Sequence, residues 1–287
     1  MHVPVMLAEA LEYLAVRPDG TYVDATAGLG GHTAAIAARL TTGTVIALDR
    51  DAESLERARQ NTLAWAERIR YRQAQFSGIG QALEGLGIGK IDGLLADLGV
   101  SRYQLTAPER GFSLASSGPL DMRMDRTQSL TAAELVNTLS EKDLADLIYS
   151  LGEEGRSRQI ARAIVRARRL PDDTLHLARV IEGASPRTGR LSPATRTFLA
   201  LRRAVNRETE ELDALLETAP GLIASGGRMV VITFMSLEDR PVKEAFRNLA
   251  RQGRARLLTK HVVTPGREET VLNPPSRSAK LRAVEMG

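Results

Sequence analysis

The fold is decided by the stretch Tyr22-Val-Asp-Ala-Thr-Ala-Gly-Leu-Gly-Gly-His32. A short apolar run ends at Asp24, and glycines then occupy positions 28, 30 and 31. Glycine lets a backbone come close to a ligand and turn sharply into a helix, where free N–H groups favour a carboxylate. The stretch therefore predicts a strand, a ligand-binding turn and a helix from about His32 to Leu40.

The sequence around this turn alternates β-branched runs with helical stretches. Such alternation is typical of βαβ units and of an α/β fold with a parallel sheet. The predicted strands are Tyr22–Asp24, Thr44–Leu48, Ile69–Phe76, Ile91–Ala96, Arg228–Phe234 and about Ala255–Val263. The other predicted helices of this pattern are Ala52–Ala66, Glu208–Leu216 and about Val242–Gln252.

The pattern changes in the middle of the chain. From about Leu105 to Val205 no convincing strand is found, only helical segments separated by turn signals such as Ser117-Gly-Pro119. We therefore expect an all-helical insert, residues 105–206, in an α/β domain formed by residues 1–104 and 207–287.

The composition narrows the class of protein. The chain has no cysteine, which removes disulfides, thiol nucleophiles and thiolate metal sites, and its four histidines are too scattered to suggest a metal site. No apolar run is long enough for a membrane span and no basic leader precedes an apolar block, so we expect a cytoplasmic protein without membrane attachment. The net charge of +4 suits a polyanionic partner, although 34 of the 39 basic residues are arginines spread along the chain.

The residues that follow the strands are the candidate site, because ligands of open parallel sheets bind beyond the carboxyl ends of the strands. These residues are Asp24, Asp49, Phe76 and Asp97. Each has a simpler interpretation: the glycine turn as a tight connection, Asp24 as a helix cap, Phe76 as core and Asp97 as a turn residue. Together on one edge they favour a ligand site.

The spacing favours a nucleoside without phosphates. Asp49 follows Gly28 by 21 residues, close to the ~20-residue offset at which an acid accepts hydrogen bonds from ribose hydroxyls. Gly28-x-Gly30-x-x-Thr33 lacks the third glycine of the dinucleotide fingerprint, and no P-loop lysine follows. S-adenosylmethionine fits, with Asp49 on the ribose, Phe76 near the adenine, and the backbone of residues 28–32 on the carboxylate.

Over nearly its whole length the chain resembles the MraW or RsmH methyltransferases, which methylate the exocyclic amine of a cytidine in small-subunit ribosomal RNA. The most specific motifs are Pro119-Leu-Asp-Met-Arg-Met124 and Ser236-Leu-Glu-Asp-Arg240, in that order. Other matching motifs are His2-Val-Pro-Val5, Asp19-Gly-Thr-Tyr-Val-Asp24, Gly28-Leu-Gly-Gly-His32, Asp97-Leu-Gly-Val-Ser101, Arg110-Gly-Phe112, Gly152-Glu-Glu154, Pro193-Ala-Thr-Arg-Thr-Phe198, Ala204-Val-Asn206 and Arg277-Ser-Ala-Lys-Leu-Arg282.

This resemblance implies a class I (Rossmann-like) methyltransferase sheet with an inserted helical domain. It also implies S-adenosylmethionine as the cofactor and the small-subunit ribosomal RNA, or the 30S particle, as the partner. Two departures from the family pattern are Arg102 in place of a second serine and Met235 in place of a histidine. The cofactor contacts that the resemblance implies are Gly30, Gly31, His32, Asp49, Phe76, Asp97 and Gln104.

Asp97 is the predicted catalytic residue. A base amine is a poor nucleophile, so an acceptor must hold one N–H while the nitrogen attacks. Asp97, or a carbonyl in the loop after it, is placed to do so; alternatively Asp97 contacts the amino group of the cofactor. Asn273-Pro-Pro-Ser276 resembles the motif of other amine methyltransferases but lacks its aromatic residue.

The insert is the predicted RNA-binding part. Residues 151–207 hold 13 arginines against five acids. The alternative is a solvated arginine face with acidic counterions. The four arginines that fall on one helical stripe, and that we expect to bind phosphates, are Arg158, Arg162, Arg166 and Arg169.

Three other functions remain open on these residues. They are a nicotinamide-dependent oxidoreductase on a similar sheet, a non-catalytic RNA-binding or ribosome-assembly protein, and a methyltransferase acting on a protein or a small molecule. The sequence leaves the oligomeric state, monomer or homodimer, undecided.

Overall fold

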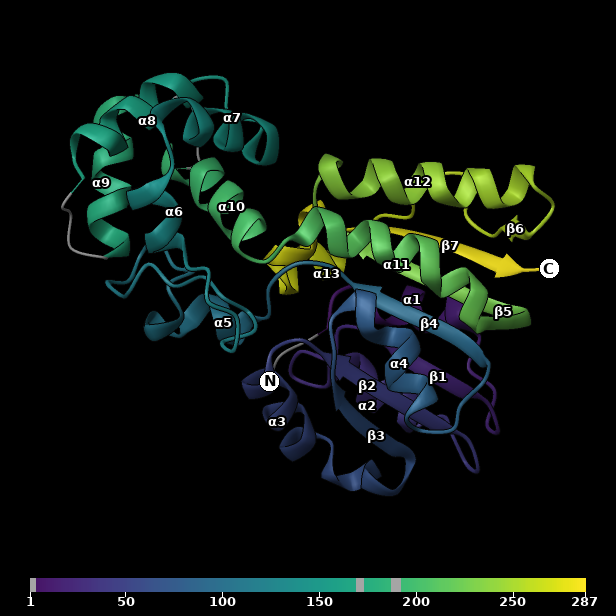
Figure 1. The fold of residues 1–287 in the computed structure, drawn as a ribbon. Helices are drawn as coiled ribbons and strands as arrows, with labels where there is room; N and C mark the ends of the chain where they lie inside the picture. Colours follow the sequence, from purple (N-terminus) through teal and green to yellow (C-terminus); the bar gives the residue numbers. More distant parts are fainter. Residues whose placement is uncertain (1–3, 169–172, 187–191) are drawn as a thin grey trace. The chain divides into compact units, whose positions relative to one another are not determined.

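The computed structural model describes residues 4–168, 173–186 and 192–287. In it the chain forms two compact units, one of residues up to 99 together with 209–287, and one of residues 100–208. The first unit carries the sheet and is built from both ends of the chain, as the colours in Figure 1 show. The predicted insert, residues 105–206, falls inside the second unit.

The first unit is built around a seven-stranded sheet with the strand order β3-β2-β1-β4-β5-β7-β6. Strands β3 to β5 in this order run parallel, and β7 is antiparallel to both of its neighbours. Because β1 pairs with both β2 and β4, the order reverses direction there, which is where open sheets of this kind bind ligands. The strands are β1 Thr21–Asp24, β2 Thr44–Asp49, β3 Ile69–Gln73, β4 Ile91–Asp97, β5 Ile223–Thr233, β6 Ala255–Leu257 and β7 Lys280–Met286.

Alternating side chains of the strands pack into two separate cores. Tyr22 joins the core on one face of the sheet, and its neighbour Val23 joins the core on the other. Helices α1, α2 and α3 cover the first face, and α4, α11 and α12 cover the second (Figure 1). The helices of this unit are α1 Leu7–Leu14, α2 Gly31–Ala37, α3 Ala52–Asn61, η1 Leu63–Arg68, η2 Phe76–Gly78, α4 Ile79–Glu84, α11 Glu208–Leu222, α12 Ser236–Arg251, α13 Arg267–Leu272 and η4 Pro274–Ser278.

The C-terminal end of the chain differs from the prediction. The predicted strand of about Ala255–Val263 is only three residues long, and the segment that follows residue 279 forms β7, which the sequence analysis missed. Arg282 of this strand is buried, and its Nε and Nη2 donate to the carboxylate of Asp239 at 2.7 and 3.0 Å. A buried, paired arginine is not available to bind the phosphates of a nucleic acid.

The second unit is helical, and no strand lies between residues 100 and 208 in the parts that the structure describes. Its core is formed by apolar faces of helices α6 to α10 and by the loop before α6. The helices are α5 Arg102–Thr106, η3 Pro108–Arg110, α6 Ala132–Thr138, α7 Glu141–Gly152, α8 Ser157–Arg166, α9 Thr174–Ala184 and α10 Ala194–Val205.

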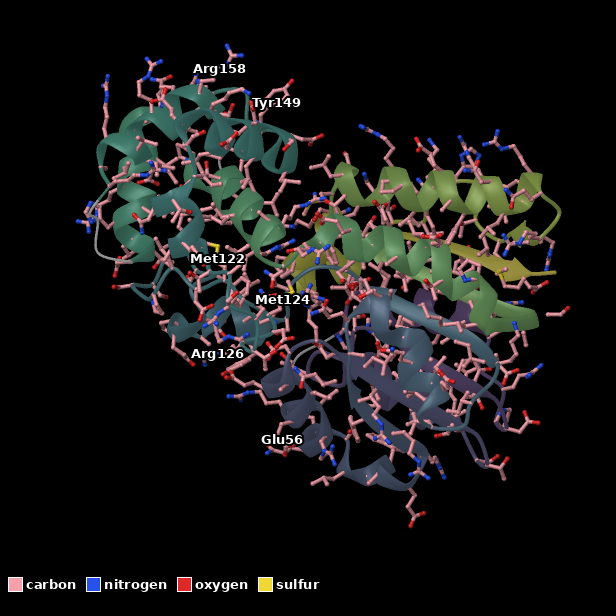
Figure 2. The ribbon with its side chains drawn as sticks, in the orientation of Figure 1. Glu56, Met122, Met124, Arg126, Tyr149 and Arg158 are labelled. Atoms are coloured by element: carbon pink, nitrogen blue, oxygen red, sulfur yellow. The ribbon has the colours of Figure 1, made fainter. Side chains whose placement is uncertain are left out.

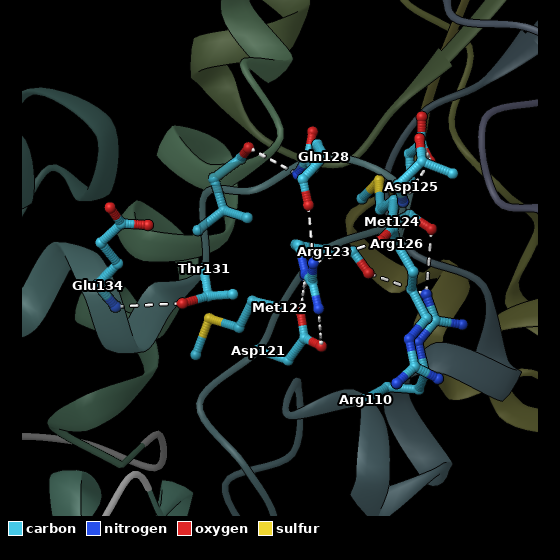
Figure 3. Close-up of polar contacts among 12 residues, drawn as sticks. Arg110, Asp121, Met122, Arg123, Met124, Asp125, Arg126, Gln128, Thr131 and Glu134 are labelled. Atoms are coloured by element: carbon cyan, nitrogen blue, oxygen red, sulfur yellow. Dashed lines mark hydrogen bonds and ion pairs between the residues drawn. The ribbon is translucent and has the colours of Figure 1, made fainter.

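The loop before α6, which contains the motif of residues 119–124, is held by two buried polar side chains. Arg110 Nη2 donates to the carbonyls of Arg123 and Met124 at 2.9 and 3.1 Å (Figure 3). Asn206 accepts from Met124 N at 2.8 Å and donates to the carbonyl of Met122 at 2.7 Å. Met122 itself has a left-handed backbone, φ 58°, so these bonds hold a conformation that a non-glycine residue rarely adopts.

Candidate cofactor and active site

The predicted site residues of the first unit follow neighbouring strands at their carboxyl ends. Asp24 ends β1, Asp49 ends β2 and Asp97 ends β4, while Phe76 follows the end of β3. Because β1 pairs with β2 on one side and with β4 on the other, the three acids lie on adjacent strands. This arrangement places them at the point where the strand order reverses.

The turn after β1 requires glycine for two physical reasons. Gly28 and Gly30 have left-handed backbones, φ 52° and 88°. A Cβ on Gly30 would lie 2.8 Å from a methyl group of Thr62, and one on Gly31 would lie 2.4 Å from the ring of Pro4. The turn leads directly into α2, whose first backbone N–H groups have no acceptor within the helix.

The carboxylate of Asp49 is held by the backbone of this turn. Oδ2 accepts from Gly28 N at 2.8 Å and Oδ1 accepts from Asp51 N at 2.9 Å. Burial raises the pKa of Asp49 to about 7, against these hydrogen bonds, which lower it. A carboxylate offers about four lone-pair directions, so two remain for the paired hydroxyls of a ribose.

The carboxylate of Asp24 stabilises the turn by accepting hydrogen bonds from residues on both sides of its glycines. It is fully buried, its Oδ2 accepts from the Thr33 hydroxyl at 2.6 Å, and its Oδ1 accepts from Thr26 N at 3.2 Å. Burial raises its pKa to about 6. The hydroxyl of Thr26 in turn accepts from Asp97 N at 2.7 Å, so one hydrogen-bonded chain joins the ends of β1 and β4.

Asp97 combines a buried oxygen with an accessible side. Its side chain is 23% exposed, and its Oδ2 lies 3.9 Å from Nδ1 of the buried His32. Its Oδ1 is buried and makes no hydrogen bond within the described parts of the chain. An orphaned acceptor in a native structure calls for a ligand, a water or an ion.

The surroundings of Asp97 make it a strong proton acceptor. Burial is the main cause that raises its pKa well above the usual value, and the negative charges of Asp24, Glu238 and Glu269 raise it further. Glu238 is itself buried and accepts from the N–H of Phe234 at 2.9 Å.

The segment of residues 4–6 is held against the same edge of the sheet. The carbonyl of Val5 accepts from His32 Nε2 at 3.1 Å, which leaves Nδ1 as the nitrogen that faces Asp97. Met6 N donates to Glu269 Oε1 at 2.7 Å, across 263 residues of sequence. The tautomer of His32 is thereby set by the Val5 carbonyl.

Phe76 lies outside β3, not at its end as predicted. The strand stops at Gln73, the last bond to β2 runs from Ala74 N to the carbonyl of Asp49, and the chain then turns into η2. Phe76 is half-buried against the core that α4, α11 and α12 share, so part of its ring is available to a ligand.

The remaining predicted residues belong to the second unit. Gln104 is buried in α5, where Ser101 and Gln104 form a capping box. Its cofactor contact stays a prediction. On α8, Arg158, Arg162 and Arg166 are exposed, and Arg162 makes an ion pair of 3.3 Å with Glu141 of α7. Arg169 lies outside the described residues.

Some residues of the site were not predicted. Thr26 and Glu238 lie within quoted motifs, so their polarity beside the glycine turn and at the start of α12 was the available signal. Glu211 and Glu269 gave no local signal, because their partners are 134 and 263 residues away.

The residues present fit a nucleoside cofactor with a cationic amino-acid end. Asp49 keeps lone pairs for a ribose, the glycine turn brings backbone N–H groups to the edge, and the buried Oδ1 of Asp97 makes no hydrogen bond within the described residues. No group of three or more His, Cys, Asp or Glu side chains that suits a metal ion occurs among them.

Comparisons with known proteins identify the family. A model of the MraW methylase family matches residues 1–287. The chain belongs to the MraW methylase family. One MraW-family relative, the ribosomal RNA small subunit methyltransferase H of Solibacter usitatus, is 64% identical over 286 residues and is covered completely, as is this chain. The protein of the same name from Acidobacterium capsulatum is 51% identical, with 99% of this chain and 98% of the relative covered.

One solved structure shares the fold of this chain. A putative rRNA-methylase from Clostridium thermocellum superposes with a TM-score of 0.51 at 12% identity, and each chain is covered completely. At this identity the likeness concerns the fold alone. The predicted class I methyltransferase sheet with its helical insert is confirmed, and the chain is a methyltransferase.

Proposed function

We propose that this enzyme transfers the methyl group of S-adenosylmethionine to the exocyclic amine of a cytidine in small-subunit ribosomal RNA, in the cytoplasm. The observation that carries this proposal is the family match over the whole chain, joined to three carboxylates on adjacent strand ends. The substrate follows the names of the relatives. No helix in the described parts of the chain is long and apolar enough to cross a bilayer.

The first unit supplies the residues that hold the cofactor. Asp49 accepts from the ribose hydroxyls and Phe76 packs beside the adenine. Of the predicted turn, residues 28–32, the N–H groups of Gly28 and Gly30 donate to Asp49 and to the Ala27 carbonyl, so the N–H groups of residues 31 and 32 face the carboxylate of the cofactor. We also propose Gln104 as a cofactor contact, as the family resemblance implies. When bound, the cofactor supplies an electrophilic methyl group on a sulfonium, so no covalent intermediate with the protein is needed.

Asp97 accepts a hydrogen bond from the attacking amine and takes up its proton. Burial raises the pKa of this carboxyl, so its ionised form is a stronger base than a solvated carboxylate. A cation next to Asp97 favours the ionised form, so binding of the methyl donor prepares the carboxylate for the amine. The protein thus contributes orientation and one proton acceptor.

Replacing Asp97 by asparagine separates this role from simple binding of the cofactor. We expect single-turnover methylation to fall by about 10²-fold or more, as for loss of a general base, and cofactor affinity to fall much less. Asp92→Asn is the matched control, because Asp92 lies at the opposite end of β4 and binds Arg17 and Thr21 N. An unchanged methylation rate in Asp97→Asn rules out the catalytic role.

The exposed arginines of α8 are the proposed contact with RNA phosphates. Arg158 points away from the helical unit (Figure 2), and Arg166 is exposed two turns further along the same helix. Arg162 between them is partly neutralised by Glu141, so we expect it to contribute less. Charge supplied by arginines on one face favours a polyanion without specifying its sequence.

Reversing two charges tests this surface. Arg158→Glu with Arg166→Glu should weaken RNA binding and lower the slope of log affinity against log salt by about two, while cofactor affinity stays unchanged. The control reverses Arg247 and Arg251, which are exposed on α12 of the first unit. Equal losses for both pairs would mean a general charge effect, not a binding face on α8.

The identity of the acceptor is tested directly. Ribosomal small subunits are incubated with labelled S-adenosylmethionine and the enzyme, and the modified nucleoside is then isolated. The expected product is a cytidine methylated on its exocyclic nitrogen. Label in protein, or in another nucleoside, would contradict the proposed substrate.

A further inference from the structure

Glu211 is a buried carboxylate that the proposed chemistry does not use. It lies in the first turn of α11 and only 8% of it is exposed. Burying a carboxylate is costly unless its oxygens are hydrogen-bonded. Its two oxygens have one shared partner: Ser77 N donates to Oε2 and the Ser77 hydroxyl donates to Oε1, both at 3.0 Å.

The partner of Glu211 is the residue directly after Phe76. The two residues belong to η2, a single turn in which no residue is fully buried and in which Phe76 packs, half-buried, against the core. Its other anchors are backbone bonds, from Gly78 N to Gln75 O and from Ala74 N to Asp49 O. The bidentate grip of Glu211 therefore fixes the part of the turn that carries the aromatic ring.

We infer that Glu211 is a positioning residue for the adenine end of the cofactor site, acting through Ser77 on Phe76. This inference rests on the proposed function. The carboxylate of Glu211 does not touch the ligand. It holds the ring of Phe76 in one place, so that the site is preorganised and binding costs less conformational entropy. Part of the adenine site is thus anchored by α11, from the C-terminal part of the sheet unit.

Three substitutions separate positioning from folding. Glu211→Ala removes both acceptors, whereas Glu211→Gln keeps one oxygen for Ser77 N and can donate its amide N–H to the Ser77 hydroxyl. Ser77→Ala removes one of the two bonds at an exposed residue and does not threaten the core. Glu210→Ala is the matched control, an exposed acid on the same helix turn.

The readout is binding, measured by calorimetry with S-adenosylmethionine and with 5′-methylthioadenosine, which has the adenosine but no amino-acid end. We expect Glu211→Ala to weaken both ligands by the same factor, about tenfold, and Ser77→Ala to weaken both by about threefold. Glu211→Gln and Glu210→Ala should bind as the wild type does. In methylation assays the KM for the cofactor should rise while kcat at saturation stays unchanged.

Two results would overturn the inference. One is Glu211→Ala and Ser77→Ala binding both ligands with wild-type affinity, which makes the contact merely structural. The other is a loss confined to S-adenosylmethionine, which places the effect at the amino-acid end. A wild-type protein that binds neither ligand overturns the proposed function and this inference with it, so the two failures are distinguishable.

Discussion

Replacing Asp49 by asparagine should weaken cofactor binding by about 30-fold. The carboxylate already accepts from Gly28 N and Asp51 N, so its remaining lone pairs face the ribose. Hydrogen bonds to a charged acceptor contribute about 1.5–3 kcal/mol and neutral ones about 1 kcal/mol, so two ribose bonds lose about 2 kcal/mol together. The asparagine amide also turns an N–H toward one backbone donor, which lowers the stability of the free and the bound protein alike and leaves the affinity unchanged.

The assay is calorimetric titration with S-adenosylmethionine and with its demethylated product, S-adenosylhomocysteine, since both carry the same ribose and should lose affinity equally. Asp51→Asn is the matched control. Asp51 caps α3 through Glu53 N and Ser54 N, and asparagine is an equally good cap. Affinities of Asp49→Asn within threefold of the wild type, for both ligands, would refute the assignment of Asp49 to the ribose.

Three further results are expected. Burial raises the Asp49 pKa from 3.8 to about 7, so the stability contributed by its protonated form is lost as pH rises through about 7. Ribose hydroxyls favour the carboxylate, so the increase in Tm caused by the cofactor should be larger at about pH 8 than at about pH 6, and this difference should be smaller in Asp49→Asn. Gly111→Ala should destabilise the helical unit by about 2 kcal/mol or more, as measured by unfolding in denaturant, since φ is 75° and the new Cβ would lie 2.1 Å from a backbone carbonyl. Gly155→Ala is the control and should leave the stability unchanged, because the space around Gly155 is open. Arg282→Met should lower the free energy of unfolding by about 3 kcal/mol, because it leaves the Asp239 carboxylate unpaired. Adding Asp239→Leu should restore most of the lost stability, and no recovery would mean that the pair matters for packing alone.

Local spacing predicted the parts of the site that local backbone builds. The 21-residue offset from Gly28 to Asp49 was sufficient to place Asp49 beside the glycine turn, because consecutive parallel strands end on the same edge of the sheet and the two residues are hydrogen-bonded directly. The same logic placed Asp97 next to Asp24, two strand ends joined through Thr26.

Contacts between segments that are far apart in the sequence could not be predicted from local spacing. Strand β7 was missed because it carries the charged residues Lys280 and Arg282. The partner that allows Arg282 to be buried, the carboxylate of Asp239 on α12, is 43 residues away in the sequence. Phe76 was placed inside a strand because residues 69–76 form a run of mixed polarity that no glycine or proline interrupts. Glu211 gave no signal at all, since a buried acid on a helix resembles a surface acid until its partner is known.

The position of β7 has a consequence for how the chain is made. It is the last element along the described chain, yet it lies between β5 and β6 and is hydrogen-bonded to both. During synthesis, β6 therefore has no partner in the sheet until residues 280–286 have left the ribosomal exit tunnel, whereas the helical unit can fold earlier. Nascent chains arrested before residue 280 should hold a protease-resistant helical unit beside a sheet that remains open to cleavage.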